Sequence, residues 1–236
     1  MKLAYTPDEG TIANIDGDVL VYRIGFTTED ASEDIAMVRM NAYIDEIVFK
    51  SRASTYNIFL SAQGKANFRM QVYPHYKANR PPKPKHYGLL RQYLIDVEAA
   101  YVSENMEADD ELGINQTDST IICSIDKDLL MIPGRHYNFV KDKHSYVTPE
   151  EGTRNFYRQL LTGDKTDNIP GIYGIGPVKA EAMLGSYTKG EEYKGVVFDA
   201  YKAYFPYCDT KEVLAHINMV GKLLWIKRTP DEEYMF

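Results

Sequence analysis

The stretch Leu160–Leu184, LLTGDKTDNIPGIYGIGPVKAEAML, combines two kinds of chemistry in one short segment. Its apolar beginning is typical of the end of a helix, and the carboxylates Asp164 and Asp167 follow directly. Three glycines come next, and a proline just before Val178 favours the start of a new helix there. Acidic side chains and a glycine-rich turn are therefore expected side by side.

The glycine turn has two interpretations. Gly171, Gly174 and Gly176 leave backbone amides uncovered before a helix that carries Lys179, and this combination suits one phosphate group. The same glycines would also serve simply to tighten a turn between two helices, and the turn alone does not decide between the two. The carboxylates upstream favour the first interpretation, because a phosphate site beside a metal site indicates phosphodiester chemistry.

The composition indicates an ordinary soluble protein of 236 residues, with one large domain or one domain and a small appendage. No apolar run approaches a membrane span, and Cys123 and Cys208 have no CxxC spacing, so a cytoplasmic protein without a zinc site or disulfides is expected. The net charge of -7 argues against a generally basic surface. A basic groove remains compatible with it, because clustered metal-binding carboxylates would make the total negative.

Acidic residues follow two predicted buried strands. Thr11–Ile15 leads into Asp16-Gly17-Asp18, and the apolar stretch 119–125, which predicts a central strand, leads into Asp126-Lys127-Asp128. Open α/β sheets carry their chemistry at the carboxyl ends of the strands, so both acidic groups are candidates for a site. A turn or helix cap is the alternative role for Asp16.

The remaining pattern predicts an α/β fold, with a central, mostly parallel sheet flanked by helices and followed by a helical region. Further strands are expected over 56–60, 67–73, 137–140 and 145–147. Helices are expected over 29–51, 86–100, 193–205 and 211–224, with another beginning near 149. The expected division is a core of residues 1–158 and a helical region of residues 159–236.

A basic segment and an acidic segment complete the candidate site. Residues 76–85, YKANRPPKPK, contain four cations, no acid and three prolines, which predicts an exposed, extended loop that meets an anion or is simply solvated. Glu107–Glu111 has four carboxylates in five residues, a repulsion that a cation would relieve, although a solvated helix start is the alternative. Carboxylates suit Mg²⁺, and two such ions about 4 Å apart can clamp a phosphoryl transfer.

Together these segments resemble the 5′-nuclease family, which includes flap endonucleases, the 5′-nuclease domains of bacterial DNA polymerases and bacteriophage 5′→3′ exonucleases. The resemblance covers nearly the whole chain in order, through IDGDVLVYR, NFRMQVYPHYKANR, EADD, SIDKDLL and TGDKTDNIPGIYGIGPVKA. It is greatest to the phage-type exonucleases. It implies a PIN-like nuclease core with an arch segment near 74–105, and a helix-three-turn-helix that grips duplex DNA.

The resemblance also implies roles for individual residues. The implied metal ligands are Asp16, Glu107, Asp109, Asp110, Asp126, Asp128, Asp164 and Asp167. The implied DNA-binding residues are Arg23, Tyr76, Lys77, Arg80, Gly174, Gly176 and Lys179. Lys77 and Arg80 are expected to act in catalysis together with Asp16, Asp109 and Asp126. The carbonyls near Ile172 and Ile175 are expected to hold a monovalent cation such as K⁺.

The function implied is a 5′→3′ exonuclease or structure-specific 5′-nuclease that hydrolyses DNA, or RNA in hybrids, with two Mg²⁺ or Mn²⁺ ions. Its expected substrate is duplex DNA with a free 5′ end, a nick or a flap. The chain is expected to act as a monomer in the cytoplasm (the host cytoplasm for a viral protein), without contact with a membrane.

Two features depart from the family pattern. An aspartate is usual seven residues before the arginine that corresponds to Arg69, but Ala62 stands there. The segment between Arg80 and Glu107 is also short for an arch. Ala62 removes one expected metal ligand, and the short arch argues against a closed hole that threads a single-stranded flap.

Two other functions compete with this one. Asp16-Gly17-Asp18-Val19 and Gly163-Asp164 superficially match motifs of haloacid-dehalogenase-type phosphatases. That fold would require a strand before Gly163, whereas the pattern there predicts a helix. The third alternative is a DNA-binding homologue whose activity is reduced because Ala62 replaces a ligand.

Overall fold

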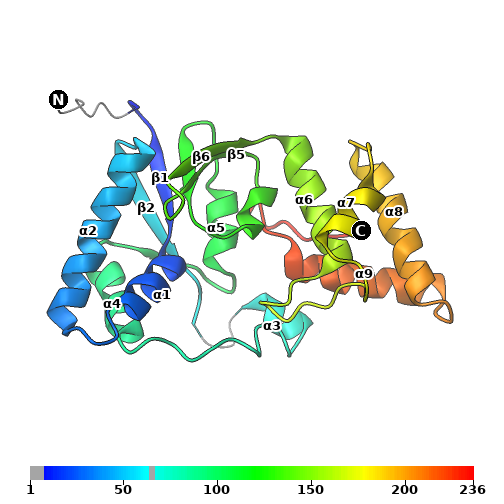
Figure 1. Cartoon of the computed structure of the whole chain (residues 1–236), viewed down its shortest axis with the longest axis horizontal. Coiled ribbons are helices and arrows are strands. Elements are labelled where there is room, and N and C mark those ends of the chain that lie inside the picture. Colours follow the sequence, from blue (N-terminus) through cyan, green and yellow to red (C-terminus); the bar gives the residue numbers. More distant parts are fainter. Residues whose placement is uncertain (1–7, 64–66) are drawn as a thin grey trace.

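The computed structural model describes residues 8–63 and 67–236, and its centre is a six-stranded sheet of order β3-β2-β1-β4-β5-β6 (Figure 1). The neighbours from β3 to β5 pair in parallel, and only β6 pairs antiparallel, with β5. The strands are β1 Ile12–Asp16, β2 Thr55–Leu60, β3 Tyr101–Val102, β4 Thr120–Cys123, β5 Gly134–Asn138 and β6 Lys143–Val147. The predicted fold class is therefore confirmed, including the central position of β4.

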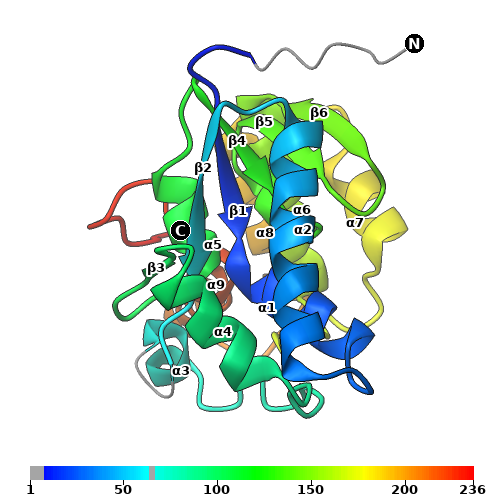
Figure 2. The ribbon, with the colours of Figure 1, turned by 90° about the vertical axis from the view of Figure 1, so that its left-hand side faces the viewer.

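Helices cover both faces of this sheet. In Figure 2, α2 (Glu33–Ser51) lies on one side of β1 and α5 (Ala108–Ile114) on the other. Alternate residues of β2 face the two sides: Ile58 and Leu60 pack with α1 (Gly17–Thr27), α2 and α4 (Tyr87–Asp96), whereas Phe59 packs with α5. This arrangement leaves the carboxyl ends of the parallel strands free to carry a site.

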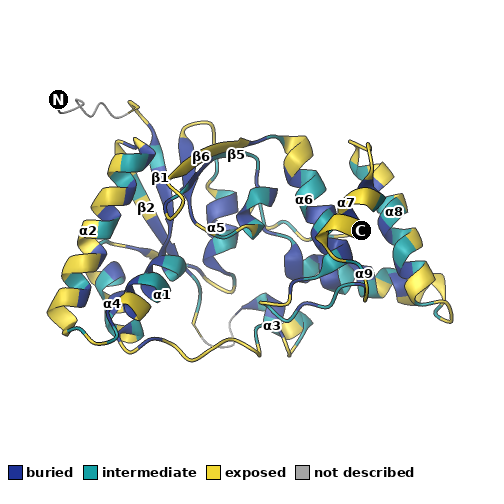
Figure 3. Cartoon of the chain, viewed as in Figure 1, coloured by how far each residue is buried: buried dark blue, intermediate teal, exposed yellow. Residues whose placement is uncertain are grey.

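The C-terminal helices continue one of these two cores. They are α6 Pro149–Thr162, α7 Pro177–Leu184, α8 Gly190–Tyr204 and α9 Thr210–Leu224. Their buried side chains belong to the same cluster as Phe59 and Leu112 of the sheet region. Figure 3 shows buried residues on the inner sides of the helices and exposed ones on the outer sides. The predicted division at residue 158 falls inside α6, so this helix joins the two regions.

One predicted strand is wrong. Residues 67–73 form the short helix α3, Phe68–Val72, together with its two flanking residues. The side-chain oxygen of Asn67 accepts a hydrogen bond from the backbone N–H of Arg69 at 3.0 Å and so caps this helix. The segment also delivers Arg69 into the interior, which a strand pattern gave no reason to expect.

Across the described residues, no helix is long and apolar enough to cross a membrane.

Candidate active site

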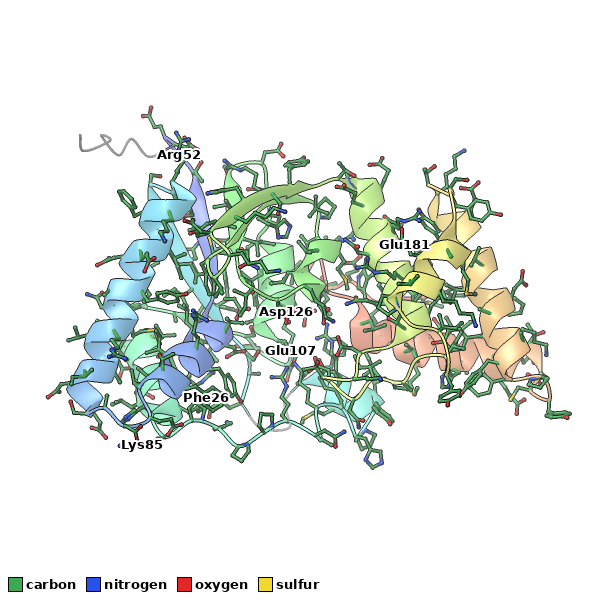
Figure 4. The ribbon with its side chains drawn as sticks, in the orientation of Figure 1. Phe26, Arg52, Lys85, Glu107, Asp126 and Glu181 are labelled. Atoms are coloured by element: carbon green, nitrogen blue, oxygen red, sulfur yellow. The ribbon has the colours of Figure 1, made fainter. Side chains whose placement is uncertain are left out.

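A cavity of about 580 Å³ opens at the carboxyl ends of β1 and β4. Four of the predicted metal ligands line it, namely Asp16, Glu107, Asp109 and Asp126. Asp16 ends β1, Asp126 follows β4, and the other two lie at the start of α5. Figure 4 shows Glu107 and Asp126 close together in the middle of the molecule. The fold thus brings together acids that are more than a hundred residues apart in sequence.

Three of these carboxylates lie in an environment that disfavours their charged form. Burial and the neighbouring charge of Asp18 raise the pKa of Asp16 to about 7. Burial, with repulsion from Asp16 and Asp126, raises the pKa of Asp109 well above its usual range. Burial also raises the pKa of Asp126. Such mutual repulsion is what a bound cation would relieve.

Glu107 differs from its neighbours because cations and a hydroxyl already surround it. Lys77 forms an ion pair with its carboxylate, and the hydroxyl of Tyr76 donates a hydrogen bond to Oε2 at 2.7 Å. Burial disfavours the charged form, but Lys77 and Arg69 outweigh it and lower the pKa of Glu107 to about 2. Glu107 is therefore fully ionised at neutral pH.

Asp128, Asp164 and Asp167 lie beside the cavity, and lysine or arginine side chains contact each of them. Lys127 Nζ lies 3.1 Å from Asp128 and 2.7 Å from Asp164. Asp167 pairs with Arg80 at 2.8 Å, and Lys77 lies 3.6 Å from it. Burial and the charge of Asp126 raise the pKa of Asp128 to about 6. Burial opposes the charge on Asp164, but Lys127 outweighs it and lowers that pKa.

The assignment of Asp110 as a metal ligand is contradicted. Both of its carboxylate oxygens contact the buried guanidinium of Arg69, at 2.6 and 2.8 Å. They also accept hydrogen bonds from the backbone N–H groups of Glu107 and Lys227, each at 3.1 Å. Consecutive residues on a helix point about 100° apart, and here Asp109 lines the cavity whereas Asp110 contacts Arg69.

These side chains suit a hard divalent cation in kind, although they do not yet enclose one. Within residues 8–63 and 67–236, no three acidic, histidine or cysteine side chains stand close enough together to hold a metal ion. The cavity nevertheless offers carboxylate oxygens, which Mg²⁺ prefers, and burial together with mutual repulsion raises the pKa values of Asp16 and Asp109. Asp16, Glu107, Asp109 and Asp126 are the residues that would hold it.

The basic segment is only partly the exposed loop that its sequence predicts. Tyr76 is buried, and Lys77, at a positive φ of 57°, turns its side chain inward to Glu107. The backbone N–H of Lys77 donates to the carbonyl of Asp167 at 2.9 Å, which joins this segment to the residues after α6. Residues 81–83 are exposed as predicted. The prolines indicated the extended part correctly, but the pull of the acidic cluster on Lys77 was missed.

The cavity has a second wall made of aromatic and basic side chains. Tyr22, Arg23 and Phe26 of α1 line it together with Lys83 and Tyr87, and the Tyr22 and Tyr87 ring centres are 5.4 Å apart. The Lys83 ammonium lies 3.9 Å from the centre of the Tyr87 ring. Phe26 is half exposed, and Figure 4 shows it at the end of α1 away from the acids. An aromatic face beside cations suits a nucleotide base with its phosphate.

Three polar residues near the acids are not among the predicted ligands, although the sequence marked Asp18 as part of a candidate acidic group. Asp18 lines the cavity, and its Oδ2 accepts a hydrogen bond from the backbone N–H of Ser61 at 3.1 Å. Ser124 donates to Asp16 Oδ2 at 2.7 Å, and Ser61 Oγ accepts from the N–H of Ala108 at 3.0 Å. The Asp-Gly-Asp spacing was a signal for Asp18. Ala62 also lines the cavity, so the residue that departs from the family pattern is at the site itself.

The glycine turn divides into a packed half and an open half. A Cβ on Gly171 would lie 2.1 Å from the backbone of Thr162, so this glycine is required for packing. Gly174, at a positive φ of 79°, and Gly176, which precedes α7, have open space around them. Lys179 is exposed beside them. The carbonyl of Ile172 accepts a hydrogen bond from Ile175 N–H at 3.1 Å, and cation binding at this pair stays a prediction.

The family comparison agrees with this geometry. The sequence model described as "5'-3' exonuclease, N-terminal resolvase-like domain" matches residues 11–159. The chain belongs to this family. The match confirms the resemblance and removes the phosphatase alternative. In the 5′-3′ exonuclease family, a 5′-3′ exonuclease of Buchnera aphidicola is 27% identical over 74% of this chain. A DNA polymerase I of Rhizobium leguminosarum is 34% identical over 51% of it.

The chain spans very different shares of these relatives, 69% of the Buchnera protein and only 14% of the polymerase. A flap endonuclease Xni of Pseudoalteromonas translucida is 29% identical over 55% of this chain and 58% of its own length. Among solved structures, a T5 5′-exonuclease mutant has a TM-score of 0.59 at 16% identity, covering 91% of this chain and 84% of its own. The catalytic core of Rad2 with DNA substrate has a TM-score of 0.53 at 13% identity, covering 99% and 83%. These two similarities support the fold.

Proposed function

We propose that this protein is a divalent-metal-dependent 5′-nuclease that hydrolyses phosphodiester bonds of DNA. The observation that carries the proposal is the composition of one cavity, in which five carboxylates share the lining with Lys77 and Arg80. Acids alone would suit many metal sites, and cations alone would suit any anion. Both together suit a phosphodiester that is attacked by water next to a metal ion. The names of the Buchnera and Pseudoalteromonas relatives support the same activity.

The carboxylates Asp16, Glu107, Asp109 and Asp126 would hold Mg²⁺ or Mn²⁺, and Asp128, Asp164 and Asp167 would serve a second ion. Bound metal would supply a water of lowered pKa and stabilise the charge that develops on the phosphate. Ser124 keeps Asp16 oriented through its hydrogen bond at 2.7 Å. Lys127, which is two-thirds exposed, can turn into solvent when a metal ion takes its place beside Asp128 and Asp164.

Lys77 and Arg80 would bind the scissile phosphate. Both side chains are partly accessible, and each is now paired with a carboxylate of the same site. A phosphate that enters the cavity would take over these cations, while the metal takes over the carboxylates. Lys77 then acts as a point charge and Arg80 as a two-pronged donor. This exchange keeps both groups ordered without leaving a buried charge unpaired.

The rest of the substrate would lie on two surfaces. The open amides near Gly174 and Gly176, with Lys179, would hold a phosphate of the duplex away from the cut. The aromatic wall with Phe26, together with Arg23, would take the unpaired end of the 5′ strand. A K⁺ ion at the Ile172 and Ile175 carbonyls would stiffen the turn. The substrate would be duplex DNA with a free 5′ end, a nick or a flap, bound by one copy of the chain.

The test is hydrolysis of labelled DNA. Nicked, flapped and blunt duplexes with a 5′ label are incubated with the protein in Mg²⁺ or in EDTA, with RNA–DNA hybrids in parallel. Asp109→Asn serves as the control, since it removes a charge from the cavity at nearly unchanged volume. We expect 5′ products only with Mg²⁺ and the unchanged protein. Tight duplex binding without any turnover would instead support the DNA-binding homologue.

A further inference from the structure

A buried ion pair lies behind the acidic end of the cavity. The side chains of Arg69 and Asp110 are 2% and 0% exposed, and two parallel hydrogen bonds join them. Arg69 also donates from Nε to the carbonyl of Leu223 at 2.9 Å and from Nη2 to that of Trp225 at 2.7 Å. The pair makes hydrogen bonds on nearly every side.

These contacts connect three segments that are far apart in sequence. Arg69 belongs to α3, Asp110 to the first turn of α5, and Leu223 and Trp225 to the end of α9. Asp110 also accepts the backbone N–H of Glu107 at one side and of Lys227 at the other, each at 3.1 Å. The backbone that carries Glu107 and Asp109 is thus fixed to the end of the C-terminal helical region.

We propose that Arg69 and Asp110 are positioning residues that set the carboxylates of Glu107 and Asp109 for metal binding and hold them in register with the C-terminal helices. The inference rests on the proposed function for its catalytic readout. Arg69 Nη1 lies 3.7 Å from Glu107 Oε2, so the guanidinium also attracts this carboxylate directly. Neither residue of the pair lines the cavity, so their effect acts through Glu107 and Asp109.

The competing explanation is that the pair only stabilises the fold. Energetics separate the two explanations, because replacing a buried ion pair by apolar residues of similar volume is often neutral for stability or even stabilising. Such a replacement keeps the packing and removes the two-pronged hydrogen bonding of Arg69 and Asp110, which orients α5 relative to the end of α9. Groups that orient metal ligands typically contribute about 10- to 100-fold to metal affinity or activity.

The test is the double substitution Arg69→Met with Asp110→Leu. We expect the variant to fold, with a lower unfolding temperature because the four backbone groups that the pair now binds lose this partner. The duplex Kd, measured in EDTA, should stay within about threefold of that of the unchanged protein. Mn²⁺ affinity, measured by calorimetry on the DNA-free protein, is expected to fall about tenfold, and kcat for nicked duplex about 10- to 100-fold with KM nearly constant. Arg52→Met with Asp8→Leu, which removes a surface pair of 3.0 Å, is the matched control and should change none of these.

A folded double variant with unchanged Mn²⁺ affinity and kcat would overturn the inference and leave the pair a structural element. If the double variant does not fold, Arg69→Lys is tested instead, because it keeps the charge but loses the planar guanidinium that donates two parallel hydrogen bonds. The same fall in Mn²⁺ affinity is expected, and an unchanged affinity would again overturn the inference. Absence of cleavage by the unchanged protein would refute the proposed function alone. The Mn²⁺ titration would still decide the positioning role.

Discussion

Two groups of ion pairs flank the start of α5, and they are built in opposite ways. The Arg69–Asp110 pair is fully buried, two-pronged and surrounded by backbone groups that accept or donate. The Lys77–Glu107 and Arg80–Asp167 pairs lie at the cavity, with Lys77 and Asp167 each 15% exposed and Arg80 40% exposed. The buried pair is closed to solvent and substrate, whereas the side chains of the cavity pairs can exchange their partners for a ligand.

The difference shows how one acidic run serves two purposes. Glu107 pairs with Lys77 at the cavity and Asp109 lines the same cavity, so under the proposed function their charges would be available for metal. Asp110, next in the chain, points away from the cavity, and both of its carboxylate oxygens contact Arg69. A helix start supplies both directions at once, because successive side chains point to different sides.

The largest effect is expected on stability, when one partner of the buried Arg69–Asp110 pair is removed and the other is kept. Arg69→Ala leaves Asp110 charged and unpaired in the interior, which should lower the free energy of unfolding by about 3–5 kcal/mol. Urea unfolding measures it. Arg52→Ala, at the exposed pair with Asp8, should change the free energy by at most about 1 kcal/mol. Equal losses in the two variants would remove the contrast between closed and exposed pairs.

The next largest effect is expected at the cavity pairs, where removal of Lys77 should lower the rate of DNA cleavage. Lys77→Ala removes a cation that would contact the scissile phosphate, so kcat should fall by about 100-fold or more. Duplex binding should change little, because the contact matters most in the transition state. Single-turnover cleavage and a binding titration measure the two. Lys85→Ala, in the exposed part of the same segment, is the control, and a normal rate for Lys77→Ala would make its inward position incidental.

Most of the strands, the acids at two of their ends and the C-terminal helices could be predicted from the sequence because each depends on local pattern, whereas the order of the strands and the short β3 (Tyr101–Val102) were not predicted. Apolar runs ending in Asp16 and Asp126 indicate strands that carry a site whatever surrounds them. The glycines of the turn were also visible, although only the structure separates Gly171, which must pack, from Gly174, which is open.

The errors share a physical cause, which is long-range charge. Arg69 was part of a predicted strand, Asp110 was a predicted ligand, and Lys77 was placed in an exposed, extended loop. Each is decided by a partner that lies 30 to 41 residues away. Local pattern records the type of residue but not its partner, and a buried charge adopts whatever conformation reaches one.

A smaller effect is expected at the glycine turn, where binding rather than chemistry should change. Lys179→Ala removes one contact with a duplex phosphate, so the slope of log K against log salt should become shallower by about one unit. Fluorescence anisotropy over a salt series measures the slope, and kcat at saturating DNA should stay the same. Lys211→Ala, exposed on α9, is the control. An unchanged slope for Lys179→Ala would assign the turn a purely structural role.

The smallest effect is expected from Ala62→Asp, which adds the carboxylate that the family pattern places there. Ala62 lines the cavity with Asp16 and Asp18, so a new charge at this position would face the metal rather than solvent. An added oxygen ligand raises affinity, and the Mg²⁺ concentration for half-maximal cleavage should fall by roughly three- to tenfold. The gain is limited, because Asp18 already brings a carboxylate to this end of the cavity and Ser61 N–H holds it there at 3.1 Å. Asp18→Asn should therefore raise the Mg²⁺ requirement in the Ala62 protein more than in the Ala62→Asp variant. If Ala62→Asp leaves the requirement unchanged while Asp18→Asn raises it, Asp18 has taken over the role of the absent aspartate; if neither substitution changes it, the metal binds away from this end of the cavity.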